Sequence, residues 1–166
     1  MDVNHDNGMI ARLEYWAAAR LAGLTDGEGL LFKTAAPWRY QVDLAGSGAE
    51  SFDRYAPFAF VKVNAIEPTR EGDYDLNLRL ELTVCIGQTA RADGDARLGN
   101  ATLPGCSALA DRVRAAFEGV HPNDDIDEGE DAFGCDNFYF AGLFDRVEEP
   151  KRHAMQLQFE CNYLAI

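Results

Sequence analysis

Residues 76–86 read Leu-Asn-Leu-Arg-Leu-Glu-Leu-Thr-Val-Cys-Ile, and this stretch decides the fold. Aliphatic residues occupy every second position without interruption, and the positions between them are mostly polar. Successive side chains of a strand point to opposite faces of a sheet, whereas a helix would scatter these aliphatic side chains around its circumference. The stretch therefore predicts a strand about 35 Å long with one aliphatic and one mostly polar face. The aliphatic face needs a cover, and the other face is free to meet water or a partner.

Two hairpins are expected around this strand. Residues 57–66 predict a neighbouring strand, apolar on both faces, that reaches 76–86 through a short turn and pairs with it antiparallel. Residues 137–147 and 152–165 predict a second hairpin, in which Gly142 marks a bulge. The chain ends close to this last strand, so we expect its end to be tied into the sheet.

Two amphipathic helices should cover the sheet. Residues 9–22 place apolar side chains on one face at steps of three and four, and Gly23 is a suitable terminator. Residues 107–118 repeat that pattern, with Ser107 as the expected N-cap and Gly119 as the terminator.

The segment between the first helix and the first hairpin is harder to interpret. Residues 30–32 are expected to form a short strand, and residues 38–42 either a second short strand or a covering loop. Residues 49–55 are consistent with one or two helical turns. We predict a mobile N-terminus over 1–8 and one α+β domain over 9–166, with an antiparallel or mixed sheet and helices packed on one face.

Composition excludes some functions. There are 28 acidic residues against 15 basic ones, a net charge of −13, which disfavours tight binding to nucleic acid because such binding depends on basic groups. The N-terminus is acidic without an apolar run, and no apolar stretch reaches the length of a membrane span, so we expect neither a signal peptide nor a membrane segment. The four cysteines are widely spaced, which favours reduced thiols over a zinc site that also uses His121.

Two long loops, 88–104 and 121–136, are the candidate interface regions, because connections of this length in a compact domain are often functional. The candidate contact residues are their charged side chains: Arg91, Asp93, Asp95, Arg97, Asp124, Asp125, Asp127, Glu128, Glu130 and Asp131. Both loops are expected to be loosely ordered in a free subunit, and removal of 124–131 is expected to leave the fold intact.

The second loop is acidic enough to suggest calcium. An EF-hand needs glycine at its sixth position, but that position is Glu128 when the loop starts at Asn123 and Glu130 when it starts at Asp125. The pattern fails in both frames, so a solvated or interface loop is favoured over a calcium site. We predict no metal and no cofactor.

Catalytic motifs are missing from the sequence. The three histidines show no recognisable spacing to a nucleophile or carboxylate, and the common hydrolase, metalloprotease and dinucleotide-binding patterns do not occur. We therefore expect a protein that is not an enzyme. A small cytosolic enzyme with an unrecognised site stays open as an alternative, because catalytic groups assemble in space.

The order of the elements resembles the tail terminator proteins of tailed bacteriophages, particularly Mu-like contractile-tailed phages. The resemblance covers most of 9–166, with the following features: the helix 9–22, the strand start Ala56-Pro57-Phe58-Ala59-Phe60-Val61, the strand 76–86 with its extended loop, the helix 107–118, and the hairpin ending in strand 155–165. The segments 25–55 and 123–131 do not match the family pattern.

The resemblance implies a virion protein, assembled in the bacterial cytoplasm, that forms a hexameric ring at the head-proximal end of the tail tube. Such a ring ends tail polymerisation and presents the head-joining surface. Its partners would be the tail tube protein, a head-completion or neck protein and the tail sheath, while genomic DNA passes through the lumen without specific binding. Another neck or head-completion protein of the same particle is the alternative.

Overall fold

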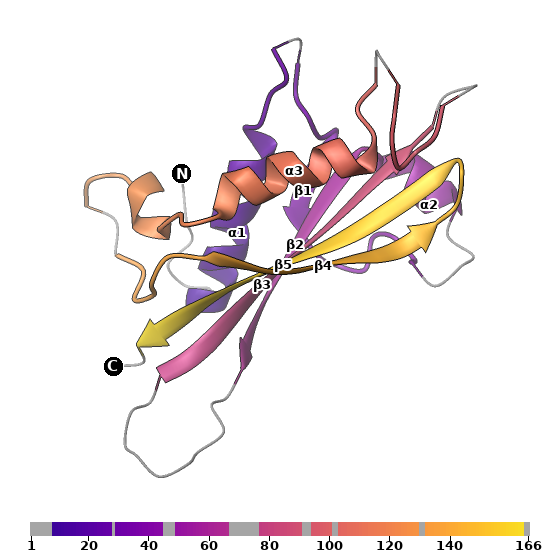
Figure 1. Cartoon of the computed structure of the whole chain (residues 1–166). Helices are drawn as coiled ribbons and strands as arrows, with labels where there is room; N and C mark the ends of the chain where they lie inside the picture. Colours follow the sequence, from indigo (N-terminus) through magenta and orange to yellow (C-terminus); the bar gives the residue numbers. More distant parts are fainter. Residues whose placement is uncertain are drawn as a thin grey trace.

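The computed structural model describes residues 8–27, 29–44, 49–66, 77–90, 94–100, 103–129 and 132–164. The elements, in chain order, are α1 (Gly8–Ala22), β1 (Thr34–Pro37), α2 (Ala49–Tyr55), β2 (Phe58–Ile66), β3 (Asn77–Thr89), α3 (Cys106–Phe117), a 3-10 helix (Pro122–Asp125), β4 (Tyr139–Glu148) and β5 (Arg152–Leu164). Five strands form one sheet in the order β1-β2-β3-β5-β4 (Figure 1). The predicted α+β class is confirmed. Gly8 already begins α1, and the rest of the expected mobile N-terminus lies outside the described residues.

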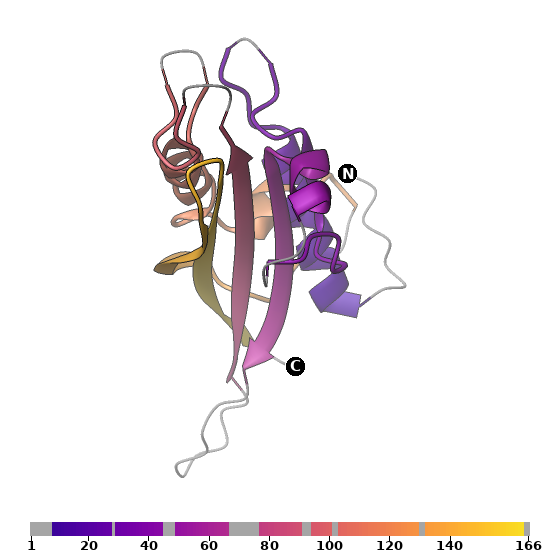
Figure 2. The same ribbon diagram turned by 90° about the vertical axis from the view of Figure 1, so that its right-hand side faces the viewer.

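The long strand predicted from the alternating stretch is the centre of the sheet. It continues three residues further than predicted, to Thr89, while Leu76, the predicted first residue, lies outside the described residues. β2 and β5 flank β3, both antiparallel to it, and β2 and β3 run side by side along the length of the molecule (Figure 2). The antiparallel pairing of both predicted hairpins is confirmed, and so is the bulge, since the β4–β5 register shifts between Phe140 and Gly142. The turn expected between β2 and β3 lies outside the described residues. β1 pairs parallel with β2, which makes the sheet mixed.

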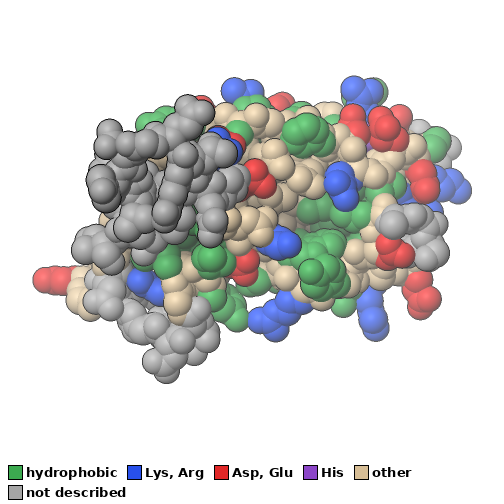
Figure 3. Space-filling view, turned by 90° about the horizontal axis from the view of Figure 1, so that it is seen from below, with side chains coloured by type: hydrophobic (Ala, Val, Ile, Leu, Met, Phe, Trp, Pro, Cys, Tyr) green, Lys and Arg blue, Asp and Glu red, His purple; other side chains and the backbone are tan. Residues whose placement is uncertain are grey.

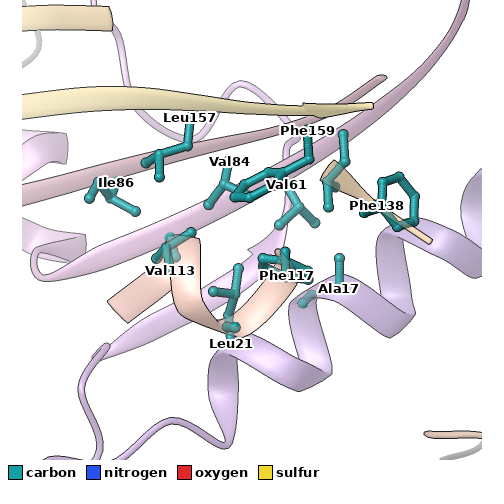
Figure 4. Packing of buried hydrophobic residues seen from close by; sticks show 14 of the residues in the cluster. Ala17, Leu21, Val61, Val84, Ile86, Val113, Phe117, Phe138, Leu157 and Phe159 are labelled. Atoms are coloured by element: carbon teal, nitrogen blue, oxygen red, sulfur yellow. The ribbon is translucent and has the colours of Figure 1, made fainter. Parts of the chain in front are cut away.

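The aliphatic face of β3 lies under α1 and α3. Leu80, Leu82, Val84 and Ile86 are each at most 2% exposed. In Figure 4, side chains of α1 and α3 point toward those of β3 and β5. The labelled members of this core are Ala17, Leu21, Val61, Val84, Ile86, Val113, Phe117, Phe138, Leu157 and Phe159. The prediction that two helices cover the aliphatic face of this strand is confirmed, because Leu80 and Leu82 share one core cluster with residues of α1 and α3.

The expectation that all helices pack on one face is wrong for α2. Phe58 and Phe60 alternate with Ala59 and Val61, so β2 is apolar on both faces and each face needs a cover. A second, smaller core on the other face joins the chain before and within α2 to the starts of β2 and β5; its buried members are Val42, Phe52, Ala56, Phe58, Phe60, Cys85 and Ala154. This core also accounts for Gly87, because a Cβ there would lie 2.2 Å from the Phe58 ring.

The segment before α2 differs from expectation. The expected strand at 30–32 is absent from the described structure, where Leu30 forms only an isolated bridge with Thr25, and the strand is Thr34–Pro37 instead. Residues 38–42 form a covering loop rather than a strand: Val42 is 2% exposed, and Trp38 packs edge-on against Phe60 with ring centroids 5.7 Å apart.

Candidate interface on the open sheet face

The described part of the first candidate loop is tied to the fold. Arg91 and Asp93 lie outside the described residues. The Asp95 carboxylate accepts hydrogen bonds from the N–H groups of Arg97, at 2.7 Å, and Leu98, at 3.0 Å, so Asp95 shapes a turn. Ala96 is 1% exposed, and its N–H donates to the carbonyl of Pro150 in the β4–β5 turn. Residues 94–100 are therefore tied to the fold by hydrogen bonds, which argues against a loosely ordered arm in this part of the loop.

The same loop also starts α3. The expected Ser107 N-cap is wrong: the N-cap is Gly105, without a side-chain hydrogen bond. The N–H groups of Cys106 and Ser107 donate instead to the carbonyls of Ala96 and Arg97, each at 2.9 Å. A distant loop thus satisfies the donors that a capping side chain would otherwise satisfy.

The acidic loop likewise contributes to the fold. The Asp125 carboxylate accepts hydrogen bonds from the indole N–H of Trp16, at 2.8 Å, and from the Arg20 guanidinium, at 2.7 Å. The Asn123 side chain bonds both the N–H and the carbonyl of Phe133. Removing 124–131 would leave the Trp16 donor without this acceptor, which argues against the expectation that the deletion leaves the fold intact.

The other acidic side chains of this loop are not gathered into a site. Asp124, Asp127 and Glu128 are exposed, while Glu130 and Asp131 lie outside the described residues. Within the described parts of the chain, no three His, Cys, Asp or Glu side chains form a group able to hold a metal ion. The structure brings the Asp125 carboxylate to α1, whereas Asp124, Asp127 and Glu128 are exposed side chains that form no common site.

The open sheet face, the face opposite α1 and α3, carries a regular array of side chains that the sequence only partly indicated. Cross-strand pairing sets three rows on it: Phe60, Cys85, Gln156 and Phe144; Lys62, Thr83, Gln158 and Gly142; Asn64, Glu81, Glu160 and Tyr139. The first row lies nearest the smaller core, where α2 and the loop 38–44 provide cover. Figure 3 views the molecule from below, the side away from α3, where apolar, basic and acidic side chains lie beside one another.

The open sheet face is hollowed. A cavity of about 380 Å³ lies over β2, β3 and β5, with Trp38 and Tyr40 on one side and Arg146 on the other. Gly142 contributes no side chain to the middle row, and the ring of Phe144 lies about 3.1 Å from the position that a Cβ at Gly142 would take. Tyr40 is 81% exposed and has a positive φ of 58°, which places an aromatic ring in solvent beside the hollow.

Several polar groups of the open sheet face, in the hollow and beside it, are loosely engaged with one another. The Glu81 carboxylate accepts from the Thr83 hydroxyl and from the Gln158 amide at 3.5 Å in each case, and Arg79 lies 3.8 Å from Glu160. Such distances are long for hydrogen bonds, which are commonly about 2.7–3.2 Å. These groups therefore retain capacity to bond a partner laid across the sheet.

β4 is an edge strand with large apolar side chains in solvent. Tyr139 is 56%, Leu143 48% and Phe144 50% exposed. Tyr139 and Phe144 belong to the open sheet face, and Leu143 pairs with Leu157 of β5. Exposed apolar groups on an edge strand are a liability for a free protein and are commonly covered by a partner.

Two buried thiols, Cys85 in the first row of the open sheet face and Cys106 in the main core, are not activated as nucleophiles. Burial raises the pKa of the Cys85 and Cys106 thiols to about 12, so both stay protonated at neutral pH. His153, 3% exposed, bonds the Asp145 carboxylate through Nε2 at 2.7 Å. The thiolate that cysteine catalysis requires is therefore disfavoured at both of these positions.

No protein-family model matches the chain, and no curated protein matches its sequence. No helix in the described part of the chain is both long and apolar enough to cross a membrane. The alternating pattern of the sequence indicated the polar positions of β3, but not the exposed aromatic residues of β4 or the contribution of Trp38 and Tyr40. The aromatic residues of β4 resemble core residues when read as sequence, so the pattern alone gave no signal that they are exposed.

Proposed function

We propose that this protein is a structural ring subunit that caps the head-proximal end of a phage tail tube. It would end tail polymerisation and offer the surface to which the head joins. The observation that carries the proposal is the combination of the open, hollowed sheet face with the exposed apolar edge of β4. The order of helices and hairpins, which resembles tail terminators, supports it.

A ring subunit must present two different surfaces, because a cyclic assembly is built from heterologous contacts. The sheet has two unlike edges: β4, long and carrying exposed apolar side chains, and β1, which is four residues long and ends at Pro37. In the proposed ring, the β4 edge of one subunit packs against a different surface of its neighbour. Burying Tyr139, Leu143 and Phe144 there would supply the apolar centre of that interface.

Charge is consistent with the proposed position in the particle. A ring of chains that each carry a net charge of −13 would repel the phosphate backbone, so DNA would pass without adhering. The remaining surfaces would contact the tail tube, the sheath and a head-completion protein. The exposed Leu98, at the tip of the turn after Asp95, is a candidate for one of these contacts.

The proposal is tested in the phage that encodes the chain, by deleting the gene and supplying it in trans. Wild-type protein should restore tails of normal length joined to filled heads. Phe144→Asp should give over-long tails that do not join heads, because a charge replaces an apolar contact at the edge. Leu30→Asp is the matched control: it changes an apolar residue that is 66% exposed and lies off the sheet, and it should restore normal particles. Normal tails after deletion of the gene would contradict the proposed function.

A further inference from the structure

The hollow of the open sheet face carries two cations without an acidic partner. Lys62 of β2 and Arg146 of β4 both line the hollow, and both are exposed. Neither side chain forms an ion pair with any residue that the structure describes. The chain as a whole has a net charge of −13, so two unpaired cations beside one hollow run against its overall charge. Complementary charge across an interface selects a partner, and here it points to an acidic one.

A β-bulge places Arg146 at the hollow. Between two paired positions the chain advances by two residues on β4, from Asp145 to Val147, but by only one on β5, from Met155 to Ala154. Arg146 is the extra residue of this bulge, and bulges re-aim side chains at the edges of sheets. The pairing of the sheet thus sets where this cation lies.

The hollow contains one carboxylate of its own. Glu81 lies in the floor, where it accepts from the Thr83 hydroxyl and the Gln158 amide at 3.5 Å in each case. Among the lining residues, two positive charges therefore stand against one negative charge. The hollow is net positive within a strongly acidic protein, and its aromatic side, formed by Trp38 and Tyr40, adds apolar contact area.

The same chain carries a surface of the opposite charge, the exposed part of the acidic loop. Asp124 and Glu128 are exposed, and neither makes an ion pair within the described part of the chain. Asp125, next to Asp124, is bound by Trp16 and Arg20, which anchors the loop to α1. An anchored loop loses less conformational freedom on docking than a free one does.

The acidic loop lies away from the hollow of its own chain. It packs against α1 on the side of the main core, whereas the hollow is on the opposite face of the sheet. Figure 1 shows the loop at the end of the molecule away from α2. A contact between the loop and a hollow must therefore join two chains. Such a contact uses a different surface on each chain, which is what a ring requires.

We propose that the hollow of one subunit binds the acidic loop of the next, with Lys62 and Arg146 facing Asp124 and Glu128. This contact rests on the proposed ring function, and it names the surface that the open sheet face meets. The hollow continues into the β4 edge, because Arg146 lies two residues from the exposed Phe144, so one contact covers both. The charge pairs fix the register of the contact and weaken as salt screens them.

The experiment reverses the charges on each side and measures the solution mass by light scattering. The hollow variant carries Lys62→Glu and Arg146→Glu, and the loop variant carries Asp124→Lys and Glu128→Lys. Each variant alone should have the mass of one chain at concentrations at which the wild type forms the ring, because like charges then face each other. An equal mixture should recover the ring mass, because every contact then joins opposite charges. Recovery also shows that both variants fold.

A matched control separates position from net charge. Lys151→Glu combined with Arg54→Glu makes the same change in net charge at two exposed cations that do not line the hollow, and it should keep the ring. A ring that is lost in this control, or an equal mixture that stays at the mass of one chain, would overturn the proposed contact.

The remaining outcomes distinguish the contact from the ring itself. A wild-type ring that persists in both charge variants would overturn the contact and leave the ring standing. Loss of the ring in the hollow variant but not in the loop variant would mean that the hollow receives another acidic surface, which also overturns the acidic loop as its occupant. A wild-type protein with the mass of one chain at every concentration would contradict the ring and the contact together.

Discussion

The two faces of β3 carry side chains from one continuous strand, yet they meet opposite environments. On one face, Leu80, Leu82 and Val84 are at most 2% exposed beneath α1 and α3. On the other, Arg79 is exposed, and Glu81 and Thr83 are half-buried in a shallow hollow. Alternate positions of a single strand thus have different roles: one set forms the main core, and the other set forms the surface that we propose for assembly.

The largest expected effect on stability comes from placing the same charged residue, Asp, on each of the two faces at neighbouring positions of β3. Leu82→Asp would place an unpaired charge in the main core and should lower the free energy of unfolding by more than about 4 kcal/mol. Thr83→Asp, one residue along on the open sheet face, should cost less than about 1 kcal/mol. Urea unfolding of both variants measures the difference, and equal losses would mean that the two faces are not distinct.

A second pair of variants compares the part of the open sheet face that the smaller core covers, at Gly87, with the part beyond it, at Gly142. Gly87→Ala would push a Cβ against the rings of Phe58 and Phe52 in the smaller core, and overpacking of this kind should cost about 1–3 kcal/mol. Gly142→Ala meets only the edge of the exposed Phe144 ring, which has room to turn away, so its cost should be under about 1 kcal/mol. Thermal unfolding of the two variants checks the order, and a larger loss for Gly142→Ala would reverse it.

A smaller effect is expected beside the covered face, where the acidic loop meets α1. Asp125→Ala removes the acceptor for Trp16 and Arg20, and a loss of about 1–2 kcal/mol should follow, part of it from the desolvated indole N–H. Asp124→Ala, at the exposed neighbouring position, should change stability by less than about 0.5 kcal/mol. Chemical unfolding measures the free energy of unfolding of both variants. Equal values would mean that Asp125 stabilises the fold no more than a solvent-exposed loop residue does.

The smallest effect concerns α2 on the other side of the sheet. The Arg152 guanidinium donates two hydrogen bonds to the Asp53 carboxylate, at 2.7 and 2.6 Å, and lowers the pKa of Asp53 below its ordinary 3.8. A lowered folded-state pKa stabilises the protein above the unfolded pKa, and this contribution is lost as pH falls through the folded value. Wild type should therefore exceed Asp53→Asn in stability at neutral pH, and the gap should narrow below about pH 4.

The measurement is a series of thermal unfolding midpoints from neutral pH into the acid range. Glu50→Gln, at an exposed carboxylate in the same helix, is the matched control and should track the wild type throughout. A gap between wild type and Asp53→Asn that stays constant with pH would show that the ion pair does not act through the charge of Asp53.

Elements with a buried face at regular spacing could be predicted from the sequence. Elements and contacts that depend on residues far apart in the sequence could not. β3, β5, α1 and α3 were predictable because each buries one face at a fixed spacing. β1 was not, because its four residues are too few to show a period, and it exists through parallel pairing with β2. The role of Asp125 depends on Trp16, 109 residues away, so no local pattern could reveal it.

The candidate site was predictable only in part, for the same reason. Alternation indicated Glu81 and Thr83 on the polar face of β3, but the exposure of Phe144 depends on β4 being the edge of the sheet. Charge drew attention to the two long loops, where Asp95 and Asp125 instead stabilise the chain's own fold. Charged residues in a long loop can either contact a partner or stabilise the chain's own fold. Only the contacts that each carboxylate makes in the structure distinguish these two roles.

The most direct test of the central claim, that the open sheet face and its β4 edge serve assembly, is the solution mass of the purified protein by light scattering across a concentration series. With an 18.3 kDa chain, the account predicts a species of about 110 kDa, six copies in a closed ring. Phe144→Asp should remain folded and give the mass of one chain, and Leu30→Asp should keep the ring. A wild-type protein that stays at the mass of one chain at every concentration, or a Phe144→Asp variant that assembles as wild type does, would contradict the account.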